Sequence, residues 1–158
     1  MNPSDSYLAL DLGTTTLAGR LVDVSGRTLA ESRRLNPQRE LGGDVIRRLE
    51  AAHKGEGGRL QWLLVAGIDQ LLAELLSLSG LPRESLRGAA AAANPAISHL
   101  LRRLPVDSIL FPPHRPRHPE GALLDPAELG LDLPVSLYLF PQVSGYVGGD
   151  LVAFLFAC

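Results

Sequence analysis

The sequence predicts an α/β fold built around one mixed sheet, and three observations lead to that prediction. The first third holds three short apolar segments separated by turn residues, as in a meander of hairpins. The middle holds a long stripe of apolar residues at helical spacing. The second half holds two further strand-like segments, each followed by a helix-like one, as in crossover units. Because 158 residues is near the usual size of one domain, we expect residues 1–158 to form a single domain around one core.

Three strands are expected in the first third, each with its own pattern. Tyr7 to Asp11 is apolar until its last residue, and Leu17 to Val24 alternates apolar with polar residues. Thr28 to Leu35 follows a Ser25-Gly26 turn signal. Thr14-Thr15-Thr16 joins the first two strands, and its β-branched residues fit strand edges better than a helix. These spacings predict three antiparallel strands.

Two helices are expected next. Asn36-Pro37-Gln38 interrupts the third strand, and Asp44 is placed to cap a short helix that begins at Val45. A longer helix is indicated by one apolar stripe, which contains Leu60, Leu64, Ile68, Leu72 and Leu76. Gly80 and Pro82 would end it.

The segment from Leu86 to Ala93 is ambiguous, because Gly88 and the alanines that follow it would also suit a helix. We expect a buried strand. The segment follows a helix, precedes the break at Asn94-Pro95, and has the small side chains that suit a central parallel strand packed on both faces.

The rest of the chain completes the expected topology. Ala96 to Leu104 predicts a helix, and the proline-rich stretch from Pro105 to Leu124 predicts an irregular excursion. Val135 to Phe140 predicts a last strand, and Gly145 to Ala157 predicts a loop that opens a helix. Right-handed crossovers would place the last two strands parallel to the first. The result is a ribonuclease-H-like arrangement: a five-stranded sheet of three antiparallel plus two parallel strands, with helices on both faces.

Charge and cysteine content indicate which binding partners and which cellular compartment to expect. A net charge of −2, from 15 basic and 17 acidic residues, gives no field that would attract nucleic acid or an anionic membrane, so we expect neither partner. Cys158 is the only cysteine, which excludes a disulfide, a cysteine-ligated iron–sulfur cluster and a cysteine zinc site within these residues and indicates a cytoplasmic location. The four histidines lack zinc-site spacing, and His99 is expected to be a packed side chain.

The candidate site is the run Asp11-Leu12-Gly13-Thr14-Thr15-Thr16 at the end of the first strand. Gly13 lets the backbone approach a phosphate, while Thr14, Thr15 and Thr16 offer backbone N–H groups and hydroxyls to it. Asp11 lies within reach of a phosphate-bound Mg²⁺ through water. Alternatively, Asp and Gly serve only the conformation of a hairpin turn. The position after the first strand of a meander favours phosphate binding.

Three runs carry a resemblance to a known family. The run from Leu8 to Thr16 resembles the first phosphate motif of the sugar kinase, heat-shock chaperone and actin superfamily. The runs from Leu35 to Leu49 and from Pro141 to Asp150 are similar to two elements of the reductive activators of corrinoid proteins. The three runs occur in that family's order and span nearly the whole chain.

The resemblance implies an actin-like ATPase whose full protein uses ATP to drive electron transfer from an iron–sulfur cluster to the cobalt of a corrinoid protein. It implies that Asp11 and Gly13 to Thr16 belong to the ATP phosphate and Mg²⁺ site. Gly148 and Gly149 would line the opposite wall, and Asp150 would join Asp11 as a catalytic carboxylate that positions a water or a metal. The alternative for this run is a glycine-rich loop with a helix cap at Asp150.

Two further polar elements remain open. Asn94 ends a parallel strand, where ligands usually bind, so it is a cofactor-binding candidate; capping the next helix explains it equally well. Asn36-Pro37-Gln38 could line the cleft mouth or bind the partner, or it could simply stop the third strand. The family usually has a glycine where this chain has Ala93 and a Thr-Thr where it has Pro95-Ala96, so the loop there is expected to differ in shape.

The resemblance also implies parts that these residues do not contain. An actin-like ATPase completes its ATP site with a second, similar half, and the iron–sulfur cluster would sit in a separate domain. We therefore expect a fragment that is inactive alone, with a corrinoid protein and the second half as partners and an apolar face that could support a homodimer. Two alternatives are the first half of a sugar- or acid-type kinase and a non-catalytic protein-interaction module of the same fold.

Overall fold

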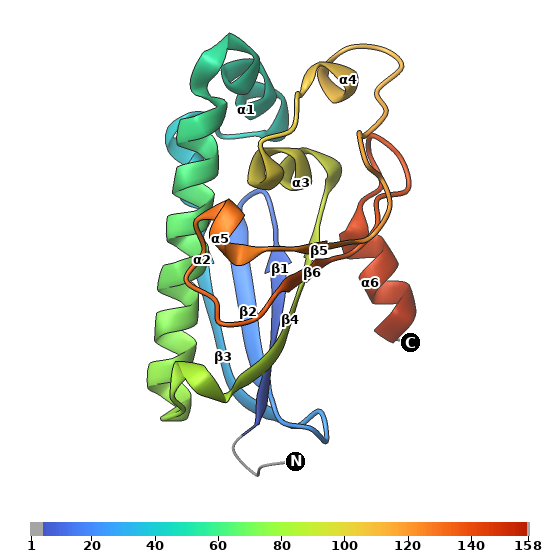
Figure 1. Cartoon of the computed structure of the whole chain (residues 1–158). Coiled ribbons are helices and arrows are strands. Elements are labelled where there is room, and N and C mark those ends of the chain that lie inside the picture. The colour runs from blue at the N-terminus through green and yellow to red at the C-terminus, as the bar shows by residue number, and fades with distance from the viewer. Residues whose placement is uncertain (1–4, 158) are drawn as a thin grey trace.

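The fold is one six-stranded mixed sheet with helices packed against it (Figure 1). The structure, a computed structural model, describes residues 5–157. Its strands are β1 Ser6–Leu12, β2 Thr16–Val22, β3 Thr28–Leu35, β4 Leu86–Ala93, β5 Ala122–Leu124 and β6 Leu137–Leu139. Its α-helices are α1 Val45–Ala51, α2 Gly57–Ser79, α3 Pro95–Arg102, α4 Asp107–Leu110, α5 Pro126–Leu129 and α6 Gly149–Ala157.

The strand order across the sheet is β3-β2-β1-β4-β6-β5. β1 pairs antiparallel with β2, and β2 pairs antiparallel with β3. β4 runs parallel to β1, and β6 runs parallel to β4. The expected three antiparallel and two parallel strands are therefore confirmed.

The expected total of five strands is wrong, because β5 adds a sixth. It pairs antiparallel with β6 at the sheet edge and lies at the end of the proline-rich stretch predicted to be irregular. Only three residues take part, too few for an alternating pattern to be visible in the sequence. The short helices α4 and α5 were also not predicted.

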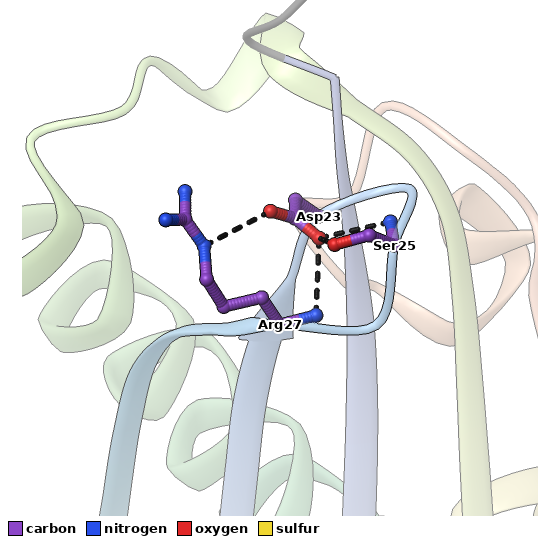
Figure 2. A network of polar contacts seen from close by, with 3 residues as sticks. All are labelled: Asp23, Ser25 and Arg27. Atoms are coloured by element: carbon purple, nitrogen blue, oxygen red, sulfur yellow. Dashed lines mark hydrogen bonds and ion pairs between the residues drawn. The ribbon is translucent and has the colours of Figure 1, made fainter.

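The hairpin between β2 and β3 is held by Asp23 at the end of the sheet remote from the β1–β2 turn. Its Oδ1 accepts the backbone N–H groups of Ser25 at 2.9 Å and Arg27 at 3.0 Å, as well as the Ser25 hydroxyl (Figure 2). The Arg27 guanidinium approaches Oδ2 at 3.2 Å. These contacts, the Ser25 hydroxyl first, lower the pKa of the Asp23 carboxyl. In this turn the Asp23 side chain accepts backbone N–H groups that would otherwise need a backbone carbonyl as partner.

α2 covers one face of the sheet along β2 and β3 (Figure 1). Its predicted stripe is confirmed: Leu60, Leu64, Ile68 and Leu72 are fully buried, and Leu76 packs partly buried against the same core. The helix ends at Gly80, whose left-handed φ of 69° forms the cap. The packing of this stripe holds α2 on the sheet on which the candidate site stands.

α1 and α2 are joined by a π-helical turn, Ala52–Glu56, into a continuous run of 35 residues, Val45–Ser79. By length and composition alone this run could cross a membrane. A buried core helix meets the same criteria, and the side chains of α2 pack on the sheet. The expectation that no membrane is a partner stays a prediction.

β4 confirms that the alanine-rich segment is a strand. Ala91 and Ala93 are fully buried, and the strand lies between β1 and β6. The opposite face of the sheet carries α6 beside β4 (Figure 1), which confirms helices on both faces. That face is only partly covered, since Tyr7 and Tyr138 remain more than a third exposed.

Candidate functional site

The β1–β2 turn has the tight backbone that the sequence predicts. The Gly13 N–H donates to the Thr16 carbonyl at 3.0 Å, and Thr16 begins β2. A Cβ on Gly13 would stand 2.7 Å from that same carbonyl oxygen, so a larger residue would push the turn apart. Thr15 is exposed at the tip, while Thr14 is half-buried. The turn therefore presents its hydroxyls at the edge where β1 ends.

Asn36 holds this turn from beneath. Its side chain is fully buried, and its Nδ2 donates to the Gly13 carbonyl at 2.9 Å. Its backbone N–H donates to the Thr15 carbonyl at 2.8 Å. Of the interpretations left open for Asn36-Pro37-Gln38, the structure places Asn36 and Gln38 in the interior. They position the turn rather than line the cleft mouth.

Asn94 reaches the turn from the end of β4. Its Nδ2 donates to the Thr14 hydroxyl oxygen at 3.1 Å, while its Oδ1 accepts the Ile97 N–H at 3.0 Å and so caps α3. The helix-capping explanation for Asn94 is therefore confirmed, and cofactor binding by this residue stays a prediction. Because the cap orients the amide, Asn94 and Thr14 join the ends of two neighbouring parallel strands.

Asp11 and Asp150 line one cavity of about 400 Å³ on the face of the sheet opposite α2. Partial burial, followed by the negative charge of Asp150, raises the pKa of the Asp11 carboxyl above its usual range. Asp150 stands exposed in the first turn of α6. A carboxylate whose charged form is disfavoured, as that of Asp11 is, can share a hydrated cation with a neighbouring carboxylate or hold a water.

The described residues contain no group of three or more His, Cys, Asp or Glu side chains arranged to hold a metal ion. A Mg²⁺ bound mainly by phosphate oxygens and water needs only one or two protein carboxylates. Asp11 and Asp150 fit that kind of ion, and they do not fit a metal held by protein ligands alone.

The glycine-rich loop packs directly on the end of β4. A Cβ on Gly148 would stand 2.5 Å from the Asn94 Cα and 2.6 Å from the Ala93 carbonyl oxygen. Gly148 and Gly149 are both buried. This close approach sets where α6 begins, and hence where Asp150 stands.

Two other features lie outside this arrangement. His99 is fully buried, with its Nδ1 3.0 Å from the Pro105 carbonyl oxygen and its Nε2 accepting the Arg117 N–H at 2.9 Å. Burial lowers the pKa of His99, and its position in the interior confirms the expected packed histidine. The largest described cavity, about 520 Å³, is lined in part by His53, Arg103 and Asp107, and no predicted site residue borders it.

Two buried polar side chains, Arg48 and Gln142, were not assigned a role in the site from the sequence. Arg48 is 1% exposed, and its Nε donates to the Gly42 carbonyl at 2.8 Å. The available signal was their position inside the two runs that resemble the corrinoid activators. Charge or periodicity alone does not distinguish a buried arginine from an exposed one.

Comparisons with known proteins show which family and which relatives this chain is similar to. Residues 7–158 match the protein family described as the RACo middle region. The chain is 29% identical over 160 residues to the corrinoid activation enzyme RamQ of Eubacterium limosum, covering 94% of this chain and 26% of that protein. The solved structure of a reductive activator for corrinoid, iron-sulfur protein matches with a TM-score of 0.91 at 27% identity, covering 97% of this chain and 25% of that one. The chain thus spans about a quarter of the length of these two relatives.

Proposed function

Since the chain belongs to the RACo middle region family, we propose that it forms the first half of an ATP-binding domain in a protein that reductively activates a corrinoid protein. The fold class and the family resemblance expected from the sequence are both confirmed. The ATP site, its residues and the corrinoid partner are the proposal.

The convergence of four elements on one turn carries the proposal. Asn36 from the end of β3 and Asn94 from the end of β4 hold the β1–β2 turn, and Asp11 and Asp150 share the adjoining cavity. In this proposal the N–H groups and hydroxyls of Gly13 to Thr16 bind the phosphates of ATP.

Mg²⁺ would be bound by the phosphates and reach Asp11 through water, with Asp150 positioning a water or the metal ion. The raised pKa of Asp11 supports this, because a nearby cation would relieve the repulsion between the two carboxylates. Gly148 and Gly149 would line the wall that carries Asp150.

The relatives support the wider role. The curated relative is named a corrinoid activation enzyme, and the solved one a reductive activator for corrinoid, iron-sulfur protein. In the complete protein, ATP would bind between this half and a second one and favour their closed arrangement. That closure would be coupled to the corrinoid partner. The iron–sulfur cluster would be held by residues outside this chain.

Calorimetry with ATP and Mg²⁺ tests the site in the complete protein. Asp11→Asn removes the carboxylate and is expected to abolish the Mg²⁺ dependence of ATP binding. Glu74→Gln is the matched control, because Glu74 is an exposed carboxylate on α2 that does not line the Asp11 cavity. Unchanged Mg²⁺-dependent binding in Asp11→Asn would refute the assigned site.

The two-part nature of the site is tested by comparing lengths of the same chain. The 158-residue chain is expected to bind ATP weakly, because half of the phosphate donors and the base pocket would come from the second half. A version extended by that half should bind tightly. Equal affinity in the two would contradict the shared site.

A further inference from the structure

The Arg48 side chain is a buried cation whose bonding is incomplete. Its Nε donates to the Gly42 carbonyl at 2.8 Å, and its Nη1 lies 3.4 Å from the Gln38 Oε1. Its Nη2 has no hydrogen-bond partner within the described part of the chain. A buried guanidinium normally has its charge and all its N–H groups satisfied, because leaving them unpaired is costly. Arg48 therefore lacks a partner of the kind its position demands.

The neighbouring carboxylates are engaged elsewhere. Asp44 pairs with the exposed Arg47 at 3.6 Å, and Glu40 faces Arg59 at 3.8 Å. Among residues 5–157, no salt bridge joins Arg48 to an acidic side chain. Arg48 Nη2 thus has no hydrogen-bond acceptor in this part of the chain, and the charge of Asp44 only partly offsets the effect of burial, which lowers the pKa of Arg48.

Arg48 borders a cavity that opens beside the β1–β2 turn. The cavity has a volume of about 240 Å³ and is lined by Thr15, Arg39, Gly43 and Arg48. Two of these four residues carry guanidinium groups, one carries a hydroxyl, and none is acidic. Arg39 is exposed, so its guanidinium is free to turn toward a ligand in the cavity. Such a lining is suited to an oxyanion, because guanidinium groups bind phosphate through charge-assisted hydrogen bonds.

A polar network connects this cavity to the candidate ATP site. Gln38 Oε1 lies 3.4 Å from both Arg48 Nη1 and Asn36 Nδ2, and the same Nδ2 donates to the Gly13 carbonyl. Thr15 itself belongs to both the turn and the cavity lining. A ligand in this cavity would therefore lie beside Thr15 of the turn, and Arg48 would connect it to Gly13 through Gln38 and Asn36.

We propose that the pocket formed by Thr15, Arg39, Gly43 and Arg48 binds a phosphate group, which is either free inorganic phosphate or the terminal phosphate of a nucleotide held by the turn. This deepens the proposed function, and only the nucleotide source of the phosphate rests on it. In this proposal the guanidinium groups of Arg48 and Arg39 supply the positive charge that the phosphate requires, and Arg39 reaches it from the surface.

The test is titration of the complete protein with inorganic phosphate at fixed ionic strength. Arg39→Gln is the decisive variant, because Arg39 is exposed and its loss leaves the core intact. Loss of one charge-assisted hydrogen bond should weaken phosphate binding about tenfold or more. Arg47→Gln is the matched control, since Arg47 is an exposed arginine of the same segment that does not line the pocket. It should change the affinity less than about twofold.

Two results would overturn the proposal: the absence of saturable phosphate binding, or equal affinities in Arg39→Gln and Arg47→Gln. Either would leave Arg48 as a structural side chain only. Arg48→Lys gives a second measure, since it keeps the charge but removes Nη2. It should weaken phosphate binding while circular dichroism shows an intact fold.

Competition distinguishes the two sources of the phosphate. If the pocket takes the terminal phosphate of the nucleotide, a non-hydrolysable ATP analogue displaces inorganic phosphate and ADP does not. If it takes free phosphate, the analogue and inorganic phosphate bind together. Asp11→Asn separates this proposal from the assigned ATP site. Loss of the Mg²⁺ dependence of nucleotide binding, with retained Arg39-dependent phosphate binding, supports both. Full Mg²⁺-dependent nucleotide binding in Asp11→Asn removes the ATP site and leaves the pocket supported.

Discussion

Gly67 of α2 offers a measurement of how tightly the long helix is packed beneath the candidate site. A Cβ on Gly67 would stand 2.9 Å from the Leu17 Cδ1 and 2.9 Å from the Pro37 Cδ. Carbon atoms in a packed core prefer separations of about 3.5 to 4.0 Å. Because the proline ring is rigid, it has little freedom to move aside. The substitution Gly67→Ala should therefore force α2 away from the turn that follows β3.

Gly58 provides the matched control in the same helix. A Cβ there would meet only the end of the flexible Arg103 side chain, at 3.6 Å. Gly58→Ala is therefore expected to stabilise the protein by about 0.5 to 1 kcal/mol through helix propensity alone. Gly67→Ala gains the same propensity term but incurs overpacking of about 1 to 3 kcal/mol. The free energies of unfolding of the two variants should thus differ by about 1 to 3 kcal/mol, since the shared term cancels.

Urea unfolding of both variants measures that difference, provided that the slope with denaturant is unchanged. Hydrogen exchange adds a local measure, because the Asn36 N–H bonded to the Thr15 carbonyl should exchange faster in Gly67→Ala. If Gly67→Ala were as stable as Gly58→Ala, the close packing of α2 against Pro37 would be refuted.

Three further predictions concern the site. Asn36→Ala should lower the free energy of unfolding by about 2 to 4 kcal/mol, because it leaves the Gly13 carbonyl and the buried Gln38 N–H unpaired. Urea unfolding measures this loss, and a value under about 0.5 kcal/mol would contradict the prediction. Burial and Asp150 raise the pKa of Asp11, so the stabilisation from protonating it is present at low pH and is lost as pH rises through the raised pKa. Asp11→Asn should therefore gain stability over wild type as pH increases from about 3.5 to 7, and a constant difference across that range would refute the raised pKa of Asp11. Gly148→Ala should lower the free energy of unfolding by about 1 to 3 kcal/mol, because its Cβ would meet backbone atoms rather than a movable side chain. Thermal or urea unfolding measures this, and an unchanged stability would show that the loop is not packed as described.

Local sequence patterns predicted most of the elements. The third strand and the alanine-rich strand were predicted with the observed bounds, Thr28–Leu35 and Leu86–Ala93. The stripe of α2 follows from helical periodicity, which depends only on neighbouring residues. β5 and α5 escaped because each is only three or four residues long, shorter than the window over which a pattern can be recognised.

The alanine run shows where propensity alone would have failed. Isolated alanines favour a helix, yet β4 is a strand because β1 and β6 offer it hydrogen bonds on both sides and its small side chains permit packing on both faces. The position between a helix and the Asn94-Pro95 break, rather than the residues themselves, indicated the outcome.

By itself, the sequence determined five of the six strands of the sheet, which helix stripe is buried, and that a carboxylate, a glycine and three hydroxyls stand where the first strand turns back. These are local properties of the chain. Only the tertiary structure decided that Asn36 and Asn94 hold this turn, that Asp11 and Asp150 line one cavity, and that Arg48 is buried without a salt bridge. Those contacts join residues separated by 23 positions for Gly13 and Asn36 and by 80 for Thr14 and Asn94. No local pattern encodes such pairs, because they exist only once strands distant in sequence lie side by side in one sheet.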